Sequence, residues 1–73
     1  MKKRKQKRNV AFQNLLKSRK ITAYKLSEML GYKERTTVYK WIYGYAEPSA
    51  SAMLKMLEIL DVSALEILRI FGE

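Results

Sequence analysis

The sequence predicts an all-α domain of five short helices, and three observations lead to this prediction. Apolar residues recur three and four positions apart along the chain, which is the spacing of one helix face. Gly, Ser, Asp and Pro residues separate these segments at places where helices commonly begin and end. Apolar residues make up 48% of the 73 residues, which is enough for one compact helical bundle near the lower size limit for a self-sufficient core.

The central segment, residues 26–44, predicts two short helices joined by a tight turn. In the first helix, Leu26 and Leu30 lie one turn apart and therefore share a face. Ser27 is small enough to let a second helix approach closely. Gly31 follows the last apolar residue, where the end of a helix commonly needs a left-handed backbone.

The second helix of this segment is predicted over about residues 35–43. Its inward face repeats at helical spacing and consists of Val38, Trp41 and Ile42. Gly44 follows and ends the helix. The opposite face carries polar and aromatic side chains, which are Arg35, Thr36, Tyr39, Lys40 and Tyr43.

Two helices are predicted on the N-terminal side of the turn. The first spans about residues 9–18. Its predicted buried face consists of Phe12, Leu15 and Leu16, with Val10 beside them. The second is the helix that holds Leu26 and Leu30, and it begins after Thr22, whose hydroxyl can cap the free backbone N–H groups of the first turn.

Two more helices are predicted in the C-terminal third of the chain. One starts at a cap formed by Ser49 or Ser51 and runs to about residue 60. After a turn at residues 61–62, an S-x-x-E capping box that starts at Ser63 begins the last helix. The predicted core-facing residues of these two helices are Met53, Leu57, Leu60, Leu65 and Leu68.

Several apolar side chains of the C-terminal helices exceed what this predicted core needs. Single exposed apolar residues are normal in a small domain, but several near one end predict a patch for self-association or for another protein. The residues of this predicted patch are Met56, Ile59, Ile67, Ile70 and Phe71.

Positive charge is concentrated toward the N-terminus of this chain, whose net charge is +8. Six of the first eight residues are Lys or Arg, whereas residues 47–73 hold two basic and five acidic side chains. The first eight residues are too charged to pack into a core, so we predict a disordered basic arm at residues 1–8 and one folded domain at residues 9–73. The arm either remains a solvated tail or grips DNA phosphates. The candidates for this contact are Lys2, Lys3, Arg4 and Lys5.

Other classes of function lack the residues that they need. The chain has no Cys and no His, so it offers no disulfide framework, no thiolate metal site and no His for acid–base catalysis. It also has no Gly-rich phosphate loop, and we expect neither an enzyme nor a bound cofactor or metal. No apolar run approaches the roughly 20 residues of a membrane span, and no apolar segment follows the basic N-terminus as it does in a signal peptide. We therefore expect a cytoplasmic protein without a membrane partner.

The ordered set of these features resembles the helix-turn-helix of the lambda-repressor-like (Cro/CI, XRE) family. Within the motif, the residues that carry the resemblance are Ser27, Gly31, Val38, Trp41 and Gly44. The likeness extends from about residue 12 to 68 and includes Ile21-Thr22, Pro48-Ser49 and Asp61-Val62-Ser63. It implies a five-helix domain that binds double-stranded DNA, similar to small phage or prophage Cro-like proteins.

The resemblance also implies roles for individual residues. It assigns contacts with base edges in the major groove to Arg35, Thr36, Tyr39 and Lys40. These side chains are chemically suitable, because Arg can pair with guanine O6 and N7, Lys can donate to the same acceptors, and Thr offers a hydroxyl or a methyl group. Phosphate contacts are implied for Thr22, Ala23, Lys25 and Tyr43.

Three departures from the family pattern affect these expectations. Ala23 replaces a Gln that often links a phosphate to the recognition helix, so it keeps only its backbone N–H for this purpose. The turn between Gly31 and Trp41 is one residue longer than is common in the family, which leaves the start of the recognition helix open by one residue. Leu16 and Ile42 occupy the places of a family salt bridge. Because an apolar pair can replace a buried ion pair at little cost in stability, we predict that these two side chains touch.

Two functions from different classes therefore stay open. The first is a sequence-specific, DNA-binding transcriptional regulator of the phage Cro type, which would place residues 35–43 in the major groove of an operator and bind it as a homodimer. The second is an antirepressor, a modulator of repression that binds a partner phage repressor protein. Exposed Tyr is common in protein interfaces, and the second function is favoured by Tyr39, Tyr43 and Tyr45 together with the apolar patch. A third, weaker hypothesis is non-specific nucleic-acid binding by the arm alone. For each of these functions we expect the protein to be in the cytoplasm of a bacterial host cell.

Overall fold

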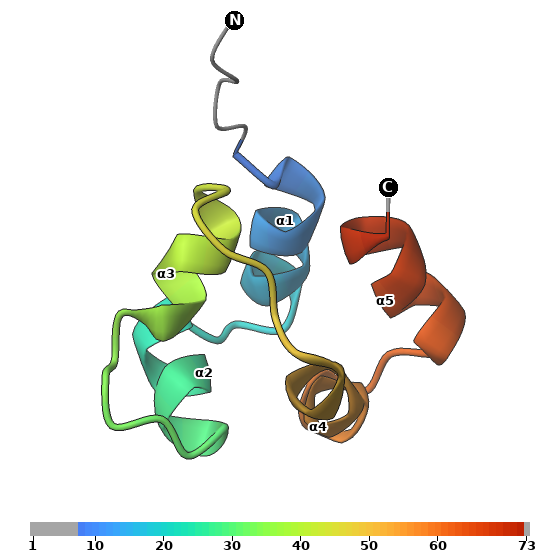
Figure 1. The fold of residues 1–73 in the computed structure, drawn as a ribbon. Helices are drawn as coiled ribbons and strands as arrows, with labels where there is room; N and C mark the ends of the chain where they lie inside the picture. Colours follow the sequence, from blue (N-terminus) through green and yellow to red (C-terminus); the bar gives the residue numbers. More distant parts are fainter. Residues whose placement is uncertain (1–7, 73) are drawn as a thin grey trace, which may run out of the picture.

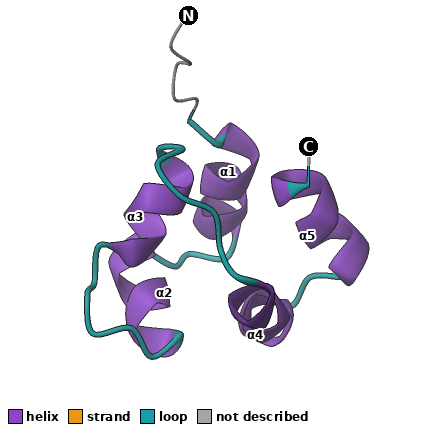
Figure 2. Cartoon of the chain, in the orientation of Figure 1, coloured by secondary structure: helices purple, strands orange, loops and turns teal. Residues whose placement is uncertain are grey.

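The computed structural model describes residues 8–72, and five α-helices follow one another in this part of the chain (Figure 1). They are α1 (Val10–Ser18), α2 (Ala23–Met29), α3 (Thr37–Ile42), α4 (Ala50–Leu60) and α5 (Ala64–Phe71). Residues 8–72 contain helices and loops but no strand, as Figure 2 shows. The predicted all-α fold of five helices is thus confirmed. Of the predicted basic arm, only Arg8, which is exposed, lies within the described residues.

All five helices contribute to one apolar core. In Figure 1, α2 and α3 lie on one side of the molecule and α5 lies on the other, with α1 between them. Aromatic rings connect the two sides. The ring centroid of Phe12 in α1 lies 6.4 Å from that of Trp41 in α3 and 4.9 Å from that of Phe71 in α5. Phe12 is therefore shared by both sides of the core.

Four of these helices begin at a side-chain cap. The side-chain oxygens of Asn9, Thr22, Ser49 and Ser63 each accept a hydrogen bond from the backbone N–H three residues later, at 3.0 to 3.2 Å. Each bond satisfies one of the backbone donors that the first turn of a helix leaves unpaired. The caps predicted at Thr22 and Ser63 are confirmed, and Ser49 rather than Ser51 caps α4.

Residues with a left-handed backbone follow four of the helices, and the one after α1 is Lys20, with a φ of 56°. Gly31 after α2 has a φ of 89°, and Gly44 after α3 has a φ of 82°. A Cβ at Gly31 would meet no atom within 4 Å. Glycine is therefore favoured at this position by its positive φ and not by a lack of space for a side chain. Asp61, with a φ of 55°, ends α4 in the same way, and Asp is one of the few residues that tolerate this conformation.

The recognition helix begins later than the sequence predicts. The prediction places its start at Arg35, but α3 runs over Thr37–Ile42, and Arg35 and Thr36 belong to the preceding turn. The longer turn accommodates Tyr32, whose ring packs edge-on against Trp41 with the centroids 5.9 Å apart. The inward face of α3 is buried as predicted.

The buried face of α5 is not the one that the sequence predicts. Leu65 and Leu68 are 63% and 57% exposed, whereas Ile67 is 2% exposed and Ile70 packs partly buried against the core. Since α5 has apolar residues on both of these faces, helical periodicity alone allows either. Where α5 meets α1, the ring centroid of Phe71 lies 4.9 Å from that of Phe12, and Asn9 Nδ2 donates a hydrogen bond to Ile70 O at 3.0 Å.

Smaller differences of the same kind occur in α4 and α1. Met56, predicted as part of a surface patch, is completely buried. Leu60 is buried as predicted, but Met53 and Leu57 are only partly buried. In α1 the three predicted core residues are buried, while Val10 is mostly exposed. Leu16 and Ile42, predicted to touch, both belong to the buried core.

Two polar residues hold α1 to segments far away in the sequence. At its start, Asn9 donates its backbone N–H to Ile42 O at the end of α3 (2.6 Å). At its end, Arg19 donates from Nε to Leu60 O (2.6 Å) and from Nη2 to the next carbonyl oxygen (3.3 Å). Arg19 therefore supplies donors to the C-terminal end of α4, where backbone carbonyls lack partners within the helix.

Candidate nucleic-acid interface

The helix-turn-helix consists of α2, the turn at residues 30–36, and α3, and a single hydroxyl group lies at the crossing of the two helices. Ser27 is fully buried there. Its Oγ donates to Ala23 O (3.0 Å) and accepts a hydrogen bond from the Val38 N–H (3.2 Å). The second bond satisfies an amide in the first turn of α3, which has no side-chain cap of its own. Ser27 thus fixes α3 against α2 through its small size and its hydroxyl group.

The residues predicted to contact bases come from one continuous segment. Thr36, Tyr39 and Lys40 are exposed, on the side of α3 opposite its buried residues or directly before the helix. The Nζ of Lys40 lies 3.7 Å from Oε1 of Glu34 in the preceding turn. These three side chains are therefore accessible to a ligand that approaches α3 from solvent.

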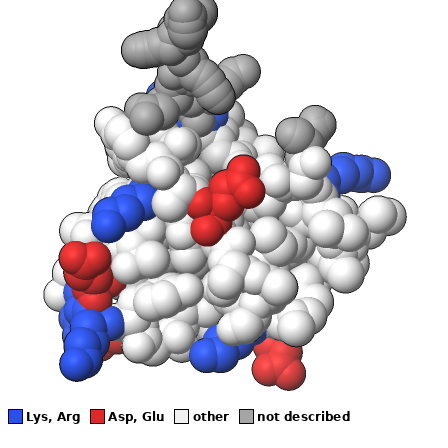
Figure 3. Space-filling model, in the orientation of Figure 1, with Lys and Arg blue, Asp and Glu red and all other residues white. Residues whose placement is uncertain are grey.

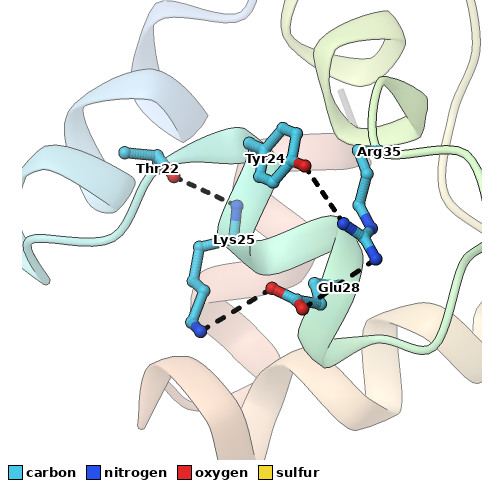
Figure 4. Close-up of polar contacts among 5 residues, drawn as sticks. All are labelled: Thr22, Tyr24, Lys25, Glu28 and Arg35. Carbon is cyan, nitrogen blue, oxygen red and sulfur yellow. Dashed lines mark hydrogen bonds and ion pairs between the residues drawn. The ribbon is translucent and has the colours of Figure 1, made fainter.

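Arg35 differs from these three residues because its side chain turns back toward α2 (Figure 4). Its Nη1 donates a hydrogen bond to Tyr24 Oη at 3.1 Å, and its Cζ lies 5.3 Å from the centroid of the Tyr24 ring. Its Nη2 lies 3.9 Å from Glu28 Oε2. We call this arrangement of Tyr24, Glu28 and Arg35 the Arg35 clamp. The Arg35 side chain is still 39% exposed.

The residues predicted to contact phosphates have three different environments. Thr22 and Lys25 are exposed at the start of α2, and Thr22 Oγ1 already accepts the backbone N–H of Lys25 (Figure 4). Ala23 is only 6% exposed, so its methyl group belongs to the core and only its backbone N–H is suited to a phosphate. Tyr43 is exposed at the end of α3. The predicted contacts of the N-terminal arm, at residues 2–5, lie outside the described residues.

Acidic residues partly neutralise the basic ones in this region. Glu28 lies near Arg35 and also near Lys25, with Oε1 3.7 Å from Nζ, and Glu34 lies near Lys40. Figure 3 shows basic and acidic groups side by side at the edge where α2 and α3 lie in Figure 1. Ion pairs that are exposed in this way contribute only about 0–1 kcal/mol to stability. Phosphate groups can therefore compete with both carboxylates for these side chains.

The predicted protein interface is only partly at the surface. Tyr39, Tyr43 and Tyr45 are exposed around the end of α3. The expectation that Met56 and Ile67 lie at the surface is wrong, because both are core residues. The other members of the predicted patch are partly buried against the core, and they are Ile59, Ile70 and Phe71. The large apolar side chains that α4 and α5 do expose are Leu54, Leu65 and Leu68.

Sequence reasoning missed Tyr24 and Glu28 as parts of the site. The available signal is their spacing, which places a ring and a carboxylate one turn apart on the same side of α2. Their partner, Arg35, was expected within the recognition helix. The path of the longer turn, which brings Arg35 back to α2, has no signature in the local sequence.

The described residues contain neither a candidate metal site nor a membrane-spanning helix. No three or more His, Cys, Asp or Glu side chains come together in residues 8–72 in a way that could hold a metal ion. None of the described helices combines the length and the apolar character that crossing a membrane requires.

The comparison with protein-family models matches this chain to a helix-turn-helix family over residues 12–67. The comparison with curated proteins and the comparison with solved structures each found no match. The matched segment begins at the central core residue Phe12, ends at the buried Ile67, and contains the whole of α2, α3 and α4. It covers well over half of the chain and agrees with the crossing of α2 and α3 at Ser27. The chain therefore belongs to the lambda-repressor-like (XRE) helix-turn-helix family of DNA-binding regulators.

Proposed function

We propose that the chain is a sequence-specific transcriptional regulator of the phage Cro type that places α3 and the preceding turn in the major groove of an operator. One observation carries this proposal. The side of α3 opposite the core, together with the turn before it, exposes side chains that can hydrogen-bond to base edges, and the buried Ser27 and Val38 hold this segment rigidly against α2. The side chains concerned are Arg35, Thr36, Tyr39 and Lys40.

The chemistry of these side chains suits direct recognition of bases. Arg35 can form two hydrogen bonds with guanine O6 and N7, and Lys40 can donate to the same kind of acceptor. Thr36 offers a hydroxyl donor or a methyl contact to thymine. Tyr39 adds a ring and a hydroxyl on the same exposed side. Readout of several adjacent base pairs by one helix follows from this arrangement.

Contacts with phosphates would fix the orientation of α3 in the groove. The start of α2 offers the backbone N–H of Ala23 and the ammonium group of Lys25, beside the cap residue Thr22. Tyr43 offers a hydroxyl at the other end of α3. The basic residues of the predicted arm add attraction that does not depend on sequence, and the proposed contacts are Lys2, Lys3, Arg4 and Lys5.

A homodimer is part of this proposal, since two copies would read two half-sites about one helical turn apart. Support comes from α5, where the exposed Leu65 and Leu68 lie three positions apart on one face. Exposed leucines at this spacing form an apolar strip that a second copy can cover. This strip differs from the predicted patch, which consists of other residues of α4 and α5.

The second candidate function is that of a modulator that binds a partner repressor protein. Three exposed tyrosines at and after α3, Tyr39, Tyr43 and Tyr45, favour it, because Tyr is enriched in protein interfaces. The ion pairs of Lys25 with Glu28 and of Lys40 with Glu34 also reduce the positive charge available to DNA. Both functions would use the same side of the molecule.

The test is a selection from a random duplex pool at near-physiological salt, followed by a comparison of the enriched duplex with a shuffled one. A preference of roughly a thousandfold or more is expected for a sequence-specific regulator. A ratio near one, with affinity that collapses as salt rises, would contradict the proposal and leave only electrostatic attraction. In that case we would search for a protein partner, and a specific partner should lose its binding to the Tyr43→Ala variant.

A matched pair of variants sharpens this test. Arg35→Ala should remove the preference at one base pair and cost roughly 1–3 kcal/mol of binding free energy for the enriched duplex. Lys55→Ala removes the same unit of charge from the exposed side of α4, and it should lower the affinity for all duplexes alike and only slightly. Equal behaviour of the two variants would contradict base recognition by Arg35.

A further inference from the structure

Arg35 lies at a position where a long side chain would ordinarily be mobile. It belongs to the turn before α3 and to no helix, and Arg has one of the largest rotamer freedoms of all residues. An Arg that contacts a base must lose this freedom on binding, which weakens the complex unless the side chain is oriented beforehand. The contacts of Arg35 in the free protein therefore bear on how it selects a base.

Several contacts orient its guanidinium group. Tyr24 Oη accepts a hydrogen bond from Nη1 at 3.1 Å, the Tyr24 ring centroid lies 5.3 Å from Cζ, and Glu28 Oε2 lies 3.9 Å from Nη2 (Figure 4). In addition, Nε is buried and has no hydrogen-bond partner among the described residues. A buried donor without a partner is unfavourable, so Tyr24 and Glu28 hold the side chain in place against this cost.

The Arg35 clamp is attached to a helix that is anchored in the core. Tyr24 and Glu28 are one turn apart on α2, and the opposite face of this helix is anchored by the completely buried Leu26 and Ser27. Ser27 also accepts the hydrogen bond from Val38 that fixes α3. One helix thus determines both the placement of α3 and the direction of Arg35.

We propose that Tyr24 and Glu28 are positioning residues that set the direction of Arg35 and thereby its selection of a guanine. This rests on the proposed function, in which Arg35 contacts a base. A guanidinium group carries five N–H donors. The Nε–H of Arg35 is buried, and Tyr24 and Glu28 occupy at most one N–H each on Nη1 and Nη2. Two donors remain, which is the number that guanine O6 and N7 need. The clamp and the base contact can therefore exist together, and Tyr24 and Glu28 act on the base only through Arg35.

Glu28 has a second and opposite effect on DNA binding. Its carboxylate also lies 3.7 Å from the Nζ of Lys25, so it places a negative charge beside the proposed phosphate contacts. This charge weakens the attraction to every duplex. Glu28 therefore lowers sequence-independent affinity while it raises selectivity, and a residue that only supports the fold would not separate these two quantities.

The experiment compares Tyr24→Phe and Glu28→Gln with the wild-type chain. The first variant keeps the ring and removes the hydroxyl acceptor, and the second keeps the shape and removes the charge. Binding is measured to the enriched duplex, to duplexes with single base-pair changes, and to a shuffled duplex. Glu58→Gln on the exposed side of α4, where Glu58 has no ion pair within the described residues, is the control for net charge.

We expect each variant to lose about three- to tenfold of its preference at one base pair, the pair at which Arg35→Ala also loses preference. Glu28→Gln should bind the shuffled duplex about twofold more tightly or better, and Glu58→Gln should change this affinity less. In an Arg35→Ala background, Tyr24→Phe should have no further effect on preference. The thermal midpoints should stay within about 3 °C of the wild-type value.

Three results would overturn the positioning role. If both variants keep their preference at every base pair while Arg35→Ala loses it, the clamp has no such role and the proposed function stands. If both lose affinity for all duplexes equally and melt earlier, their role is structural. If the wild-type chain prefers no duplex, the proposed function fails and the role of Arg35 fails with it.

A measurement without DNA tests whether the Arg35 clamp forms at all, independently of whether the wild-type chain prefers a duplex. In nuclear magnetic resonance spectra of the free protein, the N–H signal of Arg35 Nε should exchange slowly with water, because this atom is buried. The exchange should become faster in Tyr24→Phe and in Glu28→Gln. Fast exchange in the wild-type chain would overturn the clamp itself, whatever the outcome for DNA.

Discussion

The two sides of the molecule present different chemistry although one core supports both. On the α2–α3 side, charged and hydroxyl side chains pair with each other, such as Arg35 with Glu28 and Tyr24. On the α4–α5 side, large apolar side chains are exposed, and a shallow depression is lined by Leu65, Leu68, Arg69 and Gly72. Charged partners such as DNA form polar, hydrated interfaces, whereas exposed apolar patches favour contact with protein. One apolar core thus supports two surfaces of different chemistry.

The largest expected effect comes from the ring that both sides share. Phe12→Ala removes a completely buried ring that lies against Trp41 on one side and Phe71 on the other. We expect a loss of about 3–5 kcal/mol in the free energy of unfolding, measured by urea denaturation. Val10→Ala on the exposed side of the same helix is the control and should change it by less than about 0.5 kcal/mol. A small effect of Phe12→Ala would show that the two sides do not depend on one core.

The next effect sharpens the description of the α4–α5 side. Ile67→Ala should cost about 2–5 kcal/mol, because this side chain is buried. Leu68→Ala, at the neighbouring exposed position, should cost less than about 1 kcal/mol but weaken self-association, which sedimentation at several protein concentrations detects. If Leu68→Ala lowers the free energy of unfolding more than Ile67→Ala does, the buried face of α5 is the one that the sequence predicts.

A smaller effect is expected on the α2–α3 side. Ser27→Ala leaves the Val38 N–H buried without its acceptor, so we expect a loss of about 1–3 kcal/mol in the free energy of unfolding. Ser51→Ala on the exposed side of α4 removes the same hydroxyl without a buried partner and should be nearly neutral. If both variants unfold at the same urea concentration as the wild-type chain, the hydroxyl of Ser27 does not fix the crossing.

The smallest effect concerns an exposed charge on the α2–α3 side. Glu34→Gln removes the partner of Lys40, and exposed pairs of this kind contribute about 0–1 kcal/mol. We therefore expect almost unchanged stability but tighter binding to any duplex, by a factor that shrinks as salt rises. A factor that is independent of salt would contradict an electrostatic origin.

Most of the fold could be predicted from the sequence, since local signals and apolar spacing agree in the central segment. The caps at Thr22 and Ser63, the left-handed Gly31 and the end of α3 before Gly44 each have a local cause, and the structure confirms all four. In α3 the apolar residues occupy one face only, so the buried side of that helix has a single solution.

The remaining features depend on contacts between distant segments. α5 carries apolar residues on two faces, and the buried one is the face that meets α1, where Phe71 lies against Phe12 and Ile70 O accepts from Asn9. The turn before α3 packs Tyr32 against Trp41, and α3 begins only after this longer turn. The partners of Arg35 depend in turn on the path of this loop. None of these contacts leaves a periodic pattern in the sequence, and the contacts of the site with DNA stay predictions.

The two hydrogen bonds of Asn9 have a consequence for the residues that precede it. Asn9 is tied to Ile42 O at the end of α3 and to Ile70 O near the end of α5, so the preceding chain is tethered at a constant point beside the recognition helix. Six of the first eight residues are Lys or Arg. The proposed phosphate contacts of these residues would therefore be intramolecularly linked to those of α2 and α3, so they would not depend on the amount of protein in solution.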